Sequence, residues 1–145
     1  MLLCVLVLAA PAQASPTPAE ARLLVTMNQV RAQHGVRPLR IDLRLERAAR
    51  AKSRSMLRTG TFAHGDFPRR LSSYRVRGPY YGENLAWGVG ANATASGIVQ
   101  MWLASPSHRA NLLRPSFQRV GLGLVVGTFG GYGGAAVVTA NFAGR

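Results

Sequence analysis

Hydrophobic residues recur at helical spacing near the start of the chain, directly after a strong helix start. Thr17-Pro18-Ala19-Glu20 combines a capping residue, a proline at the first helical position and a carboxylate three residues after the cap. Leu24, Met27 and either Val30 or Arg31 then follow at helical spacing, and His34-Gly35 closes the segment. The pattern predicts a first helix between these two signals.

A second helix is predicted after an extended piece at residues 36–41. Asp42 can cap this helix, and Gly60 ends it. One side carries small and apolar residues and faces inward, whereas the arginines turn outward. The inward residues are Leu45, Ala49, Ser53 and Met56, and the outward residues are Arg44, Arg47, Arg50, Arg54 and Arg58.

The hydrophobic period disappears over residues 61–90, where Gly, Pro, Tyr and Ser dominate. A long irregular stretch inside a small domain is usually functional, so we expect the chemistry of the protein there. Thr94 then predicts the start of a third helix that buries Trp102, and Ser105-Pro106 starts a short helix through Leu112.

An antiparallel hairpin is predicted at the end of the chain. Val120, Leu122, Leu124 and Val126 alternate with Gly121, Gly123 and Val125, and a second apolar run covers residues 135–142. The glycine-rich residues 130–134 lie between them and predict the turn.

Length and composition narrow the class of protein. The 145 residues suit one domain, which we expect over residues 15–145 with a core at 24–142, and they exclude a multidomain enzyme. About half of the residues, 48%, are hydrophobic, which excludes a disordered basic tail. The single cysteine, Cys4, excludes a disulfide framework and a thiolate zinc site in the rest of the chain.

The first 14 residues have the features of a secretory signal peptide. Residues 2–10 are apolar, and Ala12-Gln13-Ala14 is a small-x-small cleavage pattern. The run is about half the ~20 residues of a transmembrane helix, so we expect no transmembrane segment. No Lys or Arg precedes it, so we expect a start codon upstream and a truncated basic leader; the alternative is a misread N-terminus. The prediction is a secreted protein, either extracellular or periplasmic.

The charge is strongly positive and unevenly distributed. The chain has 18 Lys and Arg against 5 Asp and Glu, a formal net charge of +13, and 13 of its 17 arginines lie between Arg22 and Arg77. For an exported protein this favours anionic envelope polymers or lipids as partners. The alternative is that the arginines provide solubility and reflect codon usage. No nucleic-acid-binding signature accompanies the charge, so we expect no specific nucleic acid.

Several short motifs occur in a characteristic order. They are Met27-Asn28-Gln29-Val30-Arg31, Phe62-Ala63-His64, Gly82-Glu83-Asn84-Leu85-Ala86, Trp102-Leu103-Ala104-Ser105-Pro106-Ser107-His108-Arg109 and Val120-Gly121-Leu122-Gly123. Together they resemble the CAP superfamily of cysteine-rich secretory, antigen 5 and pathogenesis-related (SCP-like) domains, in its short secreted bacterial form. No single motif is decisive, but their order and spacing make the resemblance specific.

The resemblance implies an α+β fold, a three-layer α-β-α sandwich with a central antiparallel sheet. It also implies a large cleft into which His64, Glu83 and His108 project, with Asn84 as a further candidate ligand-binding residue. Several relatives hold a divalent metal with two histidines and two acids. Here the second acid is absent, because the segment Leu103 to Ser105 contains no carboxylate.

The residue types at this site allow three kinds of function. His64 and His108 could ligate Zn²⁺ with Glu83 as a third ligand, or Glu83 could orient one imidazole as a metal-free general base. The zincin motif His-Glu-x-x-His is absent, and Ser105 has a sufficient explanation as a helix cap rather than as a nucleophile. Taken singly, each of the three residues could also be an ordinary structural side chain.

We therefore expect a monomeric ligand-binding module of the envelope or extracellular space, with a His/Glu/His cleft and a basic surface. One alternative is a metal-assisted or Ser/His-dependent hydrolase of peptide or cell-wall substrates, with His64, Glu83 and His108 as catalytic candidates. Another is a purely structural or interaction protein, in which the three residues only stabilise the fold.

Overall fold

The computed structural model describes residues 15–144, so the predicted signal peptide lies outside the described residues. Five α-helices, one 3-10 helix and four strands follow one another in this range. Their bounds are α1 Pro18–Gln33, β1 Arg40–Ile41, α2 Leu43–Thr59, α3 Phe67–Ser73, β2 Tyr81–Gly88, η1 Gly90–Ala93, α4 Ala95–Ala104, α5 Pro106–Leu112, β3 Phe117–Phe129 and β4 Tyr132–Gly144. Among the described residues, no helix is both long and apolar enough to cross a bilayer.

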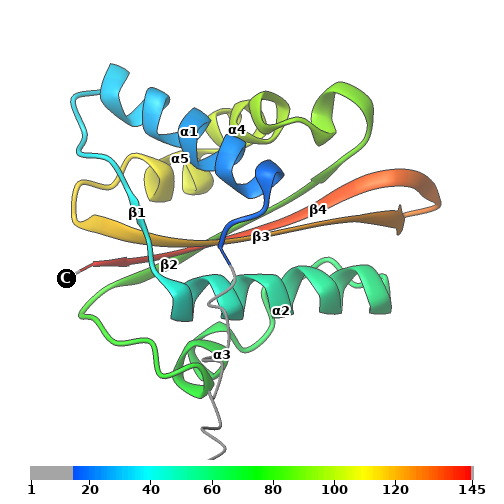
Figure 1. The fold of residues 1–145 in the computed structure, drawn as a ribbon, viewed down its shortest axis with the longest axis horizontal. Coiled ribbons are helices and arrows are strands. Elements are labelled where there is room, and N and C mark those ends of the chain that lie inside the picture. Colours follow the sequence, from blue (N-terminus) through cyan, green and yellow to red (C-terminus); the bar gives the residue numbers. More distant parts are fainter. Residues whose placement is uncertain (1–14, 145) are drawn as a thin grey trace, which may run out of the picture.

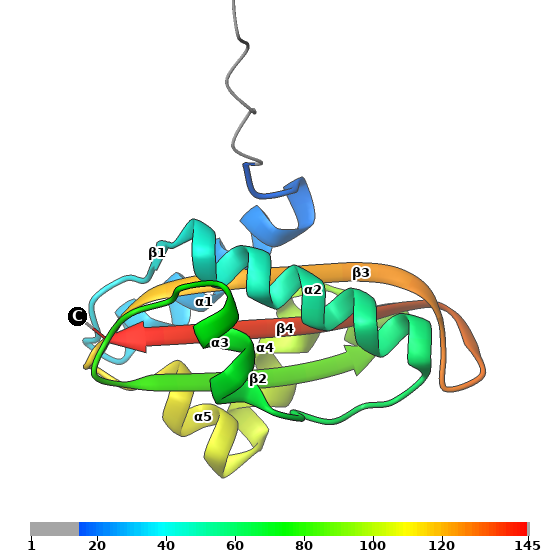
Figure 2. The ribbon, with the colours of Figure 1, turned by 90° about the horizontal axis from the view of Figure 1, so that it is seen from below.

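The elements form three layers, as expected. Helices α1, α4 and α5 cover one face of the sheet, and α2 and α3 cover the other (Figure 1). Seen from below, α2 runs along β3 and β4, and α3 lies toward β2 (Figure 2). The strand order is β1-β3-β4-β2, so that β1 and β2 form the opposite edges of the sheet.

The predicted helix starts are confirmed by their capping contacts. Thr17 Oγ1 accepts the backbone N–H of Glu20, and Glu20 Oε2 accepts that of Thr17, which completes a capping box. Asp42 caps α2 by accepting two backbone N–H groups, and Thr94 caps α4. Ser105 is at the N-cap position of α5, but its side chain makes no capping hydrogen bond, so that part of the expectation is wrong.

The predicted inward side of α2 is buried, with one correction on its outward side. Arg50 does not turn to solvent: its Nε donates to Glu20 Oε1 at 3.0 Å, and its Nη2 lies 3.2 Å from Glu46 Oε1. Burial opposes ionisation of Glu20, but the hydrogen bonds from Arg50 and Thr17 lower its pKa on balance. Arg50 therefore joins α2 to the start of α1.

Two elements lie where the sequence showed no periodicity. Helix α3 is only seven residues long and begins at Asp66, whose side chain caps it. Strand β2 is buried over most of its length on both faces, so its polar and apolar residues do not alternate. The C-terminal hairpin is confirmed, but both strands are longer than expected and only Gly130 and Gly131 form the turn, both with positive φ.

Ser53 joins α2 to the centre of the sheet. Its hydroxyl group lies 2.8 Å from the carbonyl oxygen of Gly123 on β3 and 2.9 Å from Thr139 Oγ1 on β4. We expect Ser53→Ala to lower the free energy of unfolding by about 1–2 kcal/mol, because it leaves buried polar atoms without a partner. Urea denaturation measures the loss. Ser55→Ala, at a half-buried position two residues along the same helix, is the control, and an equal loss in both variants would contradict this role.

Candidate functional site

Strand β2 places the candidate site at an edge of the sheet. Successive residues point to opposite faces, so Glu83 faces the layer of α2 and α3, whereas Asn84 faces α5. Two backbone carbonyl groups on the outer edge of β2 accept hydrogen bonds from side chains of α4 and α5. Trp102 Nε1 donates to the carbonyl of Leu85 at 3.1 Å, and Asn111 Nδ2 donates to the carbonyl of Glu83 at 3.3 Å.

Glu83 is a buried carboxylate with three partners. Its side chain is only 2% exposed. Oε1 lies 2.8 Å from His64 Nδ1, and Oε2 accepts a hydrogen bond from the Arg70 guanidinium. Asn141 lies directly opposite Glu83 in the register of β4; with its amide nitrogen facing the acid, it donates to Oε2 at 2.9 Å. The carboxylate is therefore neutralised and held in place from three sides.

His64 is oriented by this carboxylate but remains accessible. Its side chain is 53% exposed, and its carbonyl oxygen accepts a hydrogen bond of 3.0 Å from Arg70 Nη1. In the neutral ring, donation of the Nδ1–H to the carboxylate leaves the lone pair on the second ring nitrogen, Nε2. The arrangement can accept a proton or a hydrogen bond from a ligand at Nε2.

His108 completes the group from the other side of β2. It lies near the start of α5, and Asn84 Nδ2 donates to its backbone carbonyl at 2.9 Å. Burial lowers the pKa of His108, and the neighbouring His64 lowers it further. The structure therefore brings His64, Glu83 and His108 into one neighbourhood at the β2 edge. Asn84 is fully buried on the opposite face of β2 from Glu83, where it positions α5.

The lowered pKa of His108 predicts a pH-dependent stability. The unfolded chain takes up a proton at this residue at higher pH than the folded protein does, so the free energy of unfolding rises as the pH increases toward the ordinary histidine pKa of about 6.5 and falls as the pH is lowered below it. Chemical denaturation of the protein and of His108→Asn across this range measures the effect. The slope attributed to His108 should vanish in the variant; an unchanged slope would assign it to another group.

Three further residues at this site were not identified from the sequence. Arg70 looked like one more surface arginine, Asn141 is an ordinary polar residue in a strand, and Lys52 belongs to the polar side of α2. Burial and the charge of Arg70 lower the pKa of Lys52, whereas Glu83 raises it. The charged groups of Lys52, Arg70 and Glu83 are therefore within electrostatic reach of one another. The sequence carries no signal that separates Arg70 from the other arginines.

This set of side chains does not suit a divalent metal ion. Among residues 15–144, no group of three or more His, Cys, Asp or Glu side chains is arranged to hold one. Glu83, the one carboxylate among these site residues, is already bound to the guanidinium of Arg70, and Lys52 adds a second positive charge nearby. The two imidazoles alone supply fewer ligands than a stable zinc site uses.

Within residues 15–144, four of the pockets are lined by other residues. The largest of these four, of about 780 Å³, lies between α1, the start of α4 and β3, and includes Val25 and Val126. The other three, of 380 to 430 Å³, lie around β1, the start of α2 and the segment after α3. A cleft around His64, Glu83 and His108 therefore stays a prediction.

Comparisons with known proteins find a family model and a bacterial relative that match this chain. The family model described as "CAP: Cysteine-rich secretory protein family" matches residues 24–142. The "Uncharacterized protein YkwD" of Bacillus subtilis is 33% identical over 111 residues, which are 73% of this chain and 42% of that protein. The chain thus spans less than half of this relative.

Solved structures show the same fold. An extracellular SCP-domain protein from Bacillus anthracis superposes with a TM-score of 0.73 at 24% identity, over 91% of this chain and 45% of that one. An outer surface protein from Borrelia burgdorferi superposes with a TM-score of 0.76 at 21% identity, over 91% of this chain and 96% of that one. Both likenesses concern the fold of the domain.

Proposed function

The chain belongs to the CAP family of cysteine-rich secretory proteins, and we propose that it is an extracellular ligand-binding module of this family. The ligand would bind at the β2 edge, where His64, held by the buried Glu83, and the neighbouring His108 offer imidazole groups. A basic surface would keep the protein near anionic envelope material. The relatives named as extracellular and outer surface proteins support this location.

One observation carries the proposal: Glu83 is buried with its charge compensated, yet it holds an imidazole that is half exposed. A purely structural network has no need to leave this ring open to solvent. His108, with its lowered pKa, is neutral at neutral pH and adds a second imidazole that can accept or donate a hydrogen bond. The positive charge of Lys52 nearby favours a neutral or anionic polar group over a cation.

The test uses the histidine signals in nuclear magnetic resonance. The chain has three histidines, and His34, on the exposed end of α1, serves as the internal control. We expect soluble peptidoglycan fragments or a fatty acid, added separately, to shift the imidazole signals of His64 and His108 but not of His34. His64→Ala and His108→Ala should each weaken binding about tenfold, the loss of roughly one hydrogen bond. Unchanged signals with both probes would contradict the proposal.

A hydrolase is the second candidate, because Glu83 orients His64 with its Nε2 free to act as a general base toward water. In that case hydrolysis of peptide or cell-wall substrates should fall by about 10² or more in His64→Ala, while the fold survives. Circular dichroism confirms the fold and His34→Ala is again the control. Equal activity in the protein and in His64→Ala would remove the catalytic role.

A further inference from the structure

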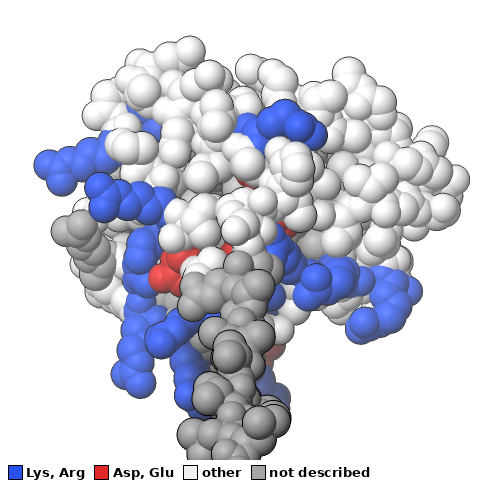
Figure 3. Space-filling view, viewed as in Figure 1, with Lys and Arg blue, Asp and Glu red and all other residues white. Residues whose placement is uncertain are grey.

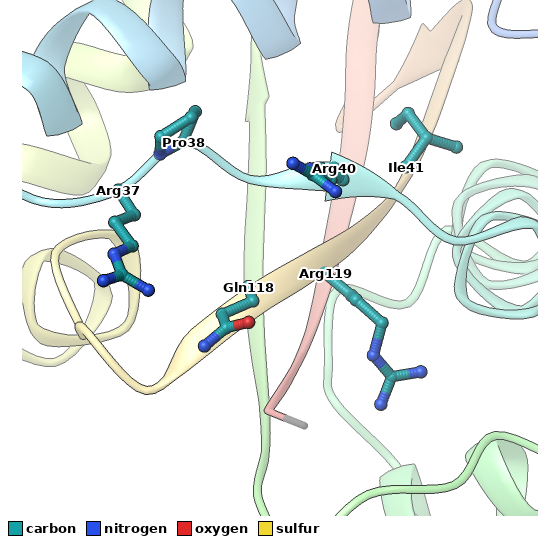
Figure 4. A pocket seen from close by; sticks show the side chains of 6 residues that line it. All are labelled: Arg37, Pro38, Arg40, Ile41, Gln118 and Arg119. Atoms are coloured by element: carbon teal, nitrogen blue, oxygen red, sulfur yellow. The ribbon is translucent and has the colours of Figure 1, made fainter.

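A second feature, on the opposite edge of the sheet from the histidines, is a hollow lined by arginines. Two pockets of about 380 and 430 Å³ adjoin around β1 and the start of α2, and they share Arg119. We call this surface the arginine groove; its arginines are Arg37, Arg40, Arg44, Arg47, Arg77 and Arg119. Figure 4 shows Arg37 and Arg119 on either side of the Gln118 amide in the first of the two pockets.

Arg119 forms the fixed centre of the arginine groove. Its Nη1 donates to Asp42 Oδ2 at 2.7 Å, and its Nη2 donates to the carbonyl oxygens of Arg77 and Gly144 at 2.5 and 2.6 Å. Asp42 also caps α2, and it is the only carboxylate that lines either pocket. The one negative charge in the groove is therefore already paired.

The remaining guanidinium groups are available to a ligand. Arg37, Arg40, Arg47 and Arg77 are exposed, and within residues 15–144 their side chains make no hydrogen bond. The other four acids cannot neutralise them: Glu20 and Glu46 pair with Arg50, Asp66 caps α3, and Glu83 pairs with Arg70. In Figure 3, Lys and Arg accordingly gather over the lower half and left end of the face shown, with little acid among them.

We propose that the arginine groove binds an extended envelope polymer that carries phosphodiester groups. Each guanidinium fork can hold two oxygens of a phosphate, and a concave wall of one charge concentrates the field. Two adjoining hollows around a fixed arginine suit a chain that follows them, whereas a flat bilayer would meet only their rims. The inference rests on the proposed location outside the cell, but not on a role for His64 or His108.

The arginine groove and the histidine site lie at opposite edges of the sheet. Because β1 and β2 are opposite edges of the sheet, a polymer in the arginine groove leaves the histidine edge uncovered. The groove would hold the protein on the envelope while a separate ligand occupies the other edge. The two sites are therefore separable by mutation.

The experiment measures binding of residues 15–145 to a synthetic poly(glycerol phosphate) by fluorescence anisotropy at several salt concentrations. The test variant is Arg37→Gln/Arg40→Gln/Arg47→Gln/Arg77→Gln. The control removes the same number of charges from exposed arginines elsewhere, in Arg22→Gln/Arg54→Gln/Arg58→Gln/Arg69→Gln. We expect the test variant to lose about 10- to 100-fold in affinity at low salt and to show a shallower salt dependence, by roughly one unit of slope per lost contact. The control should lose several-fold less.

Each other outcome overturns the proposal. Equal losses in the two variants would mean that net charge, not the groove, binds the polymer. Equal or tighter binding to polyglutamate would exclude phosphate as the recognised group, and tighter binding to vesicles of anionic phospholipid would assign the surface to a membrane. His64→Ala and His108→Ala should bind the polymer as the unchanged protein does, so a failure here is distinguishable from a failure of the proposed ligand site.

Discussion

We expect Glu83→Ala to lower the free energy of unfolding by about 3–5 kcal/mol, as removal of one partner from a buried ion pair does. The alanine leaves the guanidinium of Arg70, which is only 15% exposed, without its carboxylate, and it also removes the acceptor of His64 and Asn141. Urea denaturation followed by circular dichroism measures the loss.

A double-mutant cycle separates this pairing from other effects of the substitution. Arg70→Ala should also destabilise, and Glu83→Ala/Arg70→Ala should cost clearly less than the sum of the single changes, because neither charge is then left alone. Asp66→Ala is the control, since it removes an exposed carboxylate that only caps α3, with an expected cost of about 1 kcal/mol. If Glu83→Ala also lost only about 1 kcal/mol of its free energy of unfolding, the carboxylate would not be structurally required.

The same variant distinguishes the candidate roles of the site. If the three residues serve only the fold, ligand-induced shifts of His64 should be absent in the unchanged protein as well. If they serve a ligand, Glu83→Ala should abolish binding under conditions in which it is still folded, because the ring of His64 loses the contact that fixes its Nδ1. Comparing stability and binding in one variant therefore separates the two.

Helices α1, α2 and α4 were predictable because their signals are local, whereas α3 was not predicted. Thr17, Asp42 and Thr94 cap helices through hydrogen bonds to residues two or three positions away, and Gly60 ends α2 with positive φ. Such contacts depend on a few neighbouring residues and can be read from the sequence. The three-layer arrangement came instead from the resemblance to a family.

The composition of the site was not predictable in full, because its contacts are distant in the chain. Glu83 depends on Arg70, 13 residues earlier, and on Asn141, which faces it only through the register of β2 and β4. Nothing local distinguishes Arg70 from the arginines of the arginine groove. Arg50 was assigned to the surface for the same reason, since its partner Glu20 lies on another helix.

The fold explains why glycine occupies positions 121 and 123 of the Val120-Gly121-Leu122-Gly123 segment, which the sequence alone did not. Gly121, Asn141 and Glu83 lie opposite one another across three strands, on the face covered by α2. A Cβ atom at Gly121 would lie 2.0 Å from the backbone of Leu45 and Glu46, and one at Gly123 would lie 2.4 Å from that of Ala49. The two glycines therefore allow α2 to lie directly against β3. Gly121 is in the same cross-strand row as Asn141 and Glu83 of the site.

We expect Gly121→Ala to destabilise the protein by more than about 3 kcal/mol, above the usual cost of one added methyl group in a core, because the obstacle is helix backbone rather than a side chain that can rotate. Thermal denaturation measures the loss. Gly133→Ala, where an added Cβ meets nothing within 4 Å, is the control and should stay within about 0.5 kcal/mol. The backbone N–H of Ala49 on α2 donates to the side chain of Asn141 beside Glu83, so any Gly121→Ala protein that still folds should also show altered imidazole signals at His64. Stability close to that of the control would contradict the close approach of α2 to the sheet.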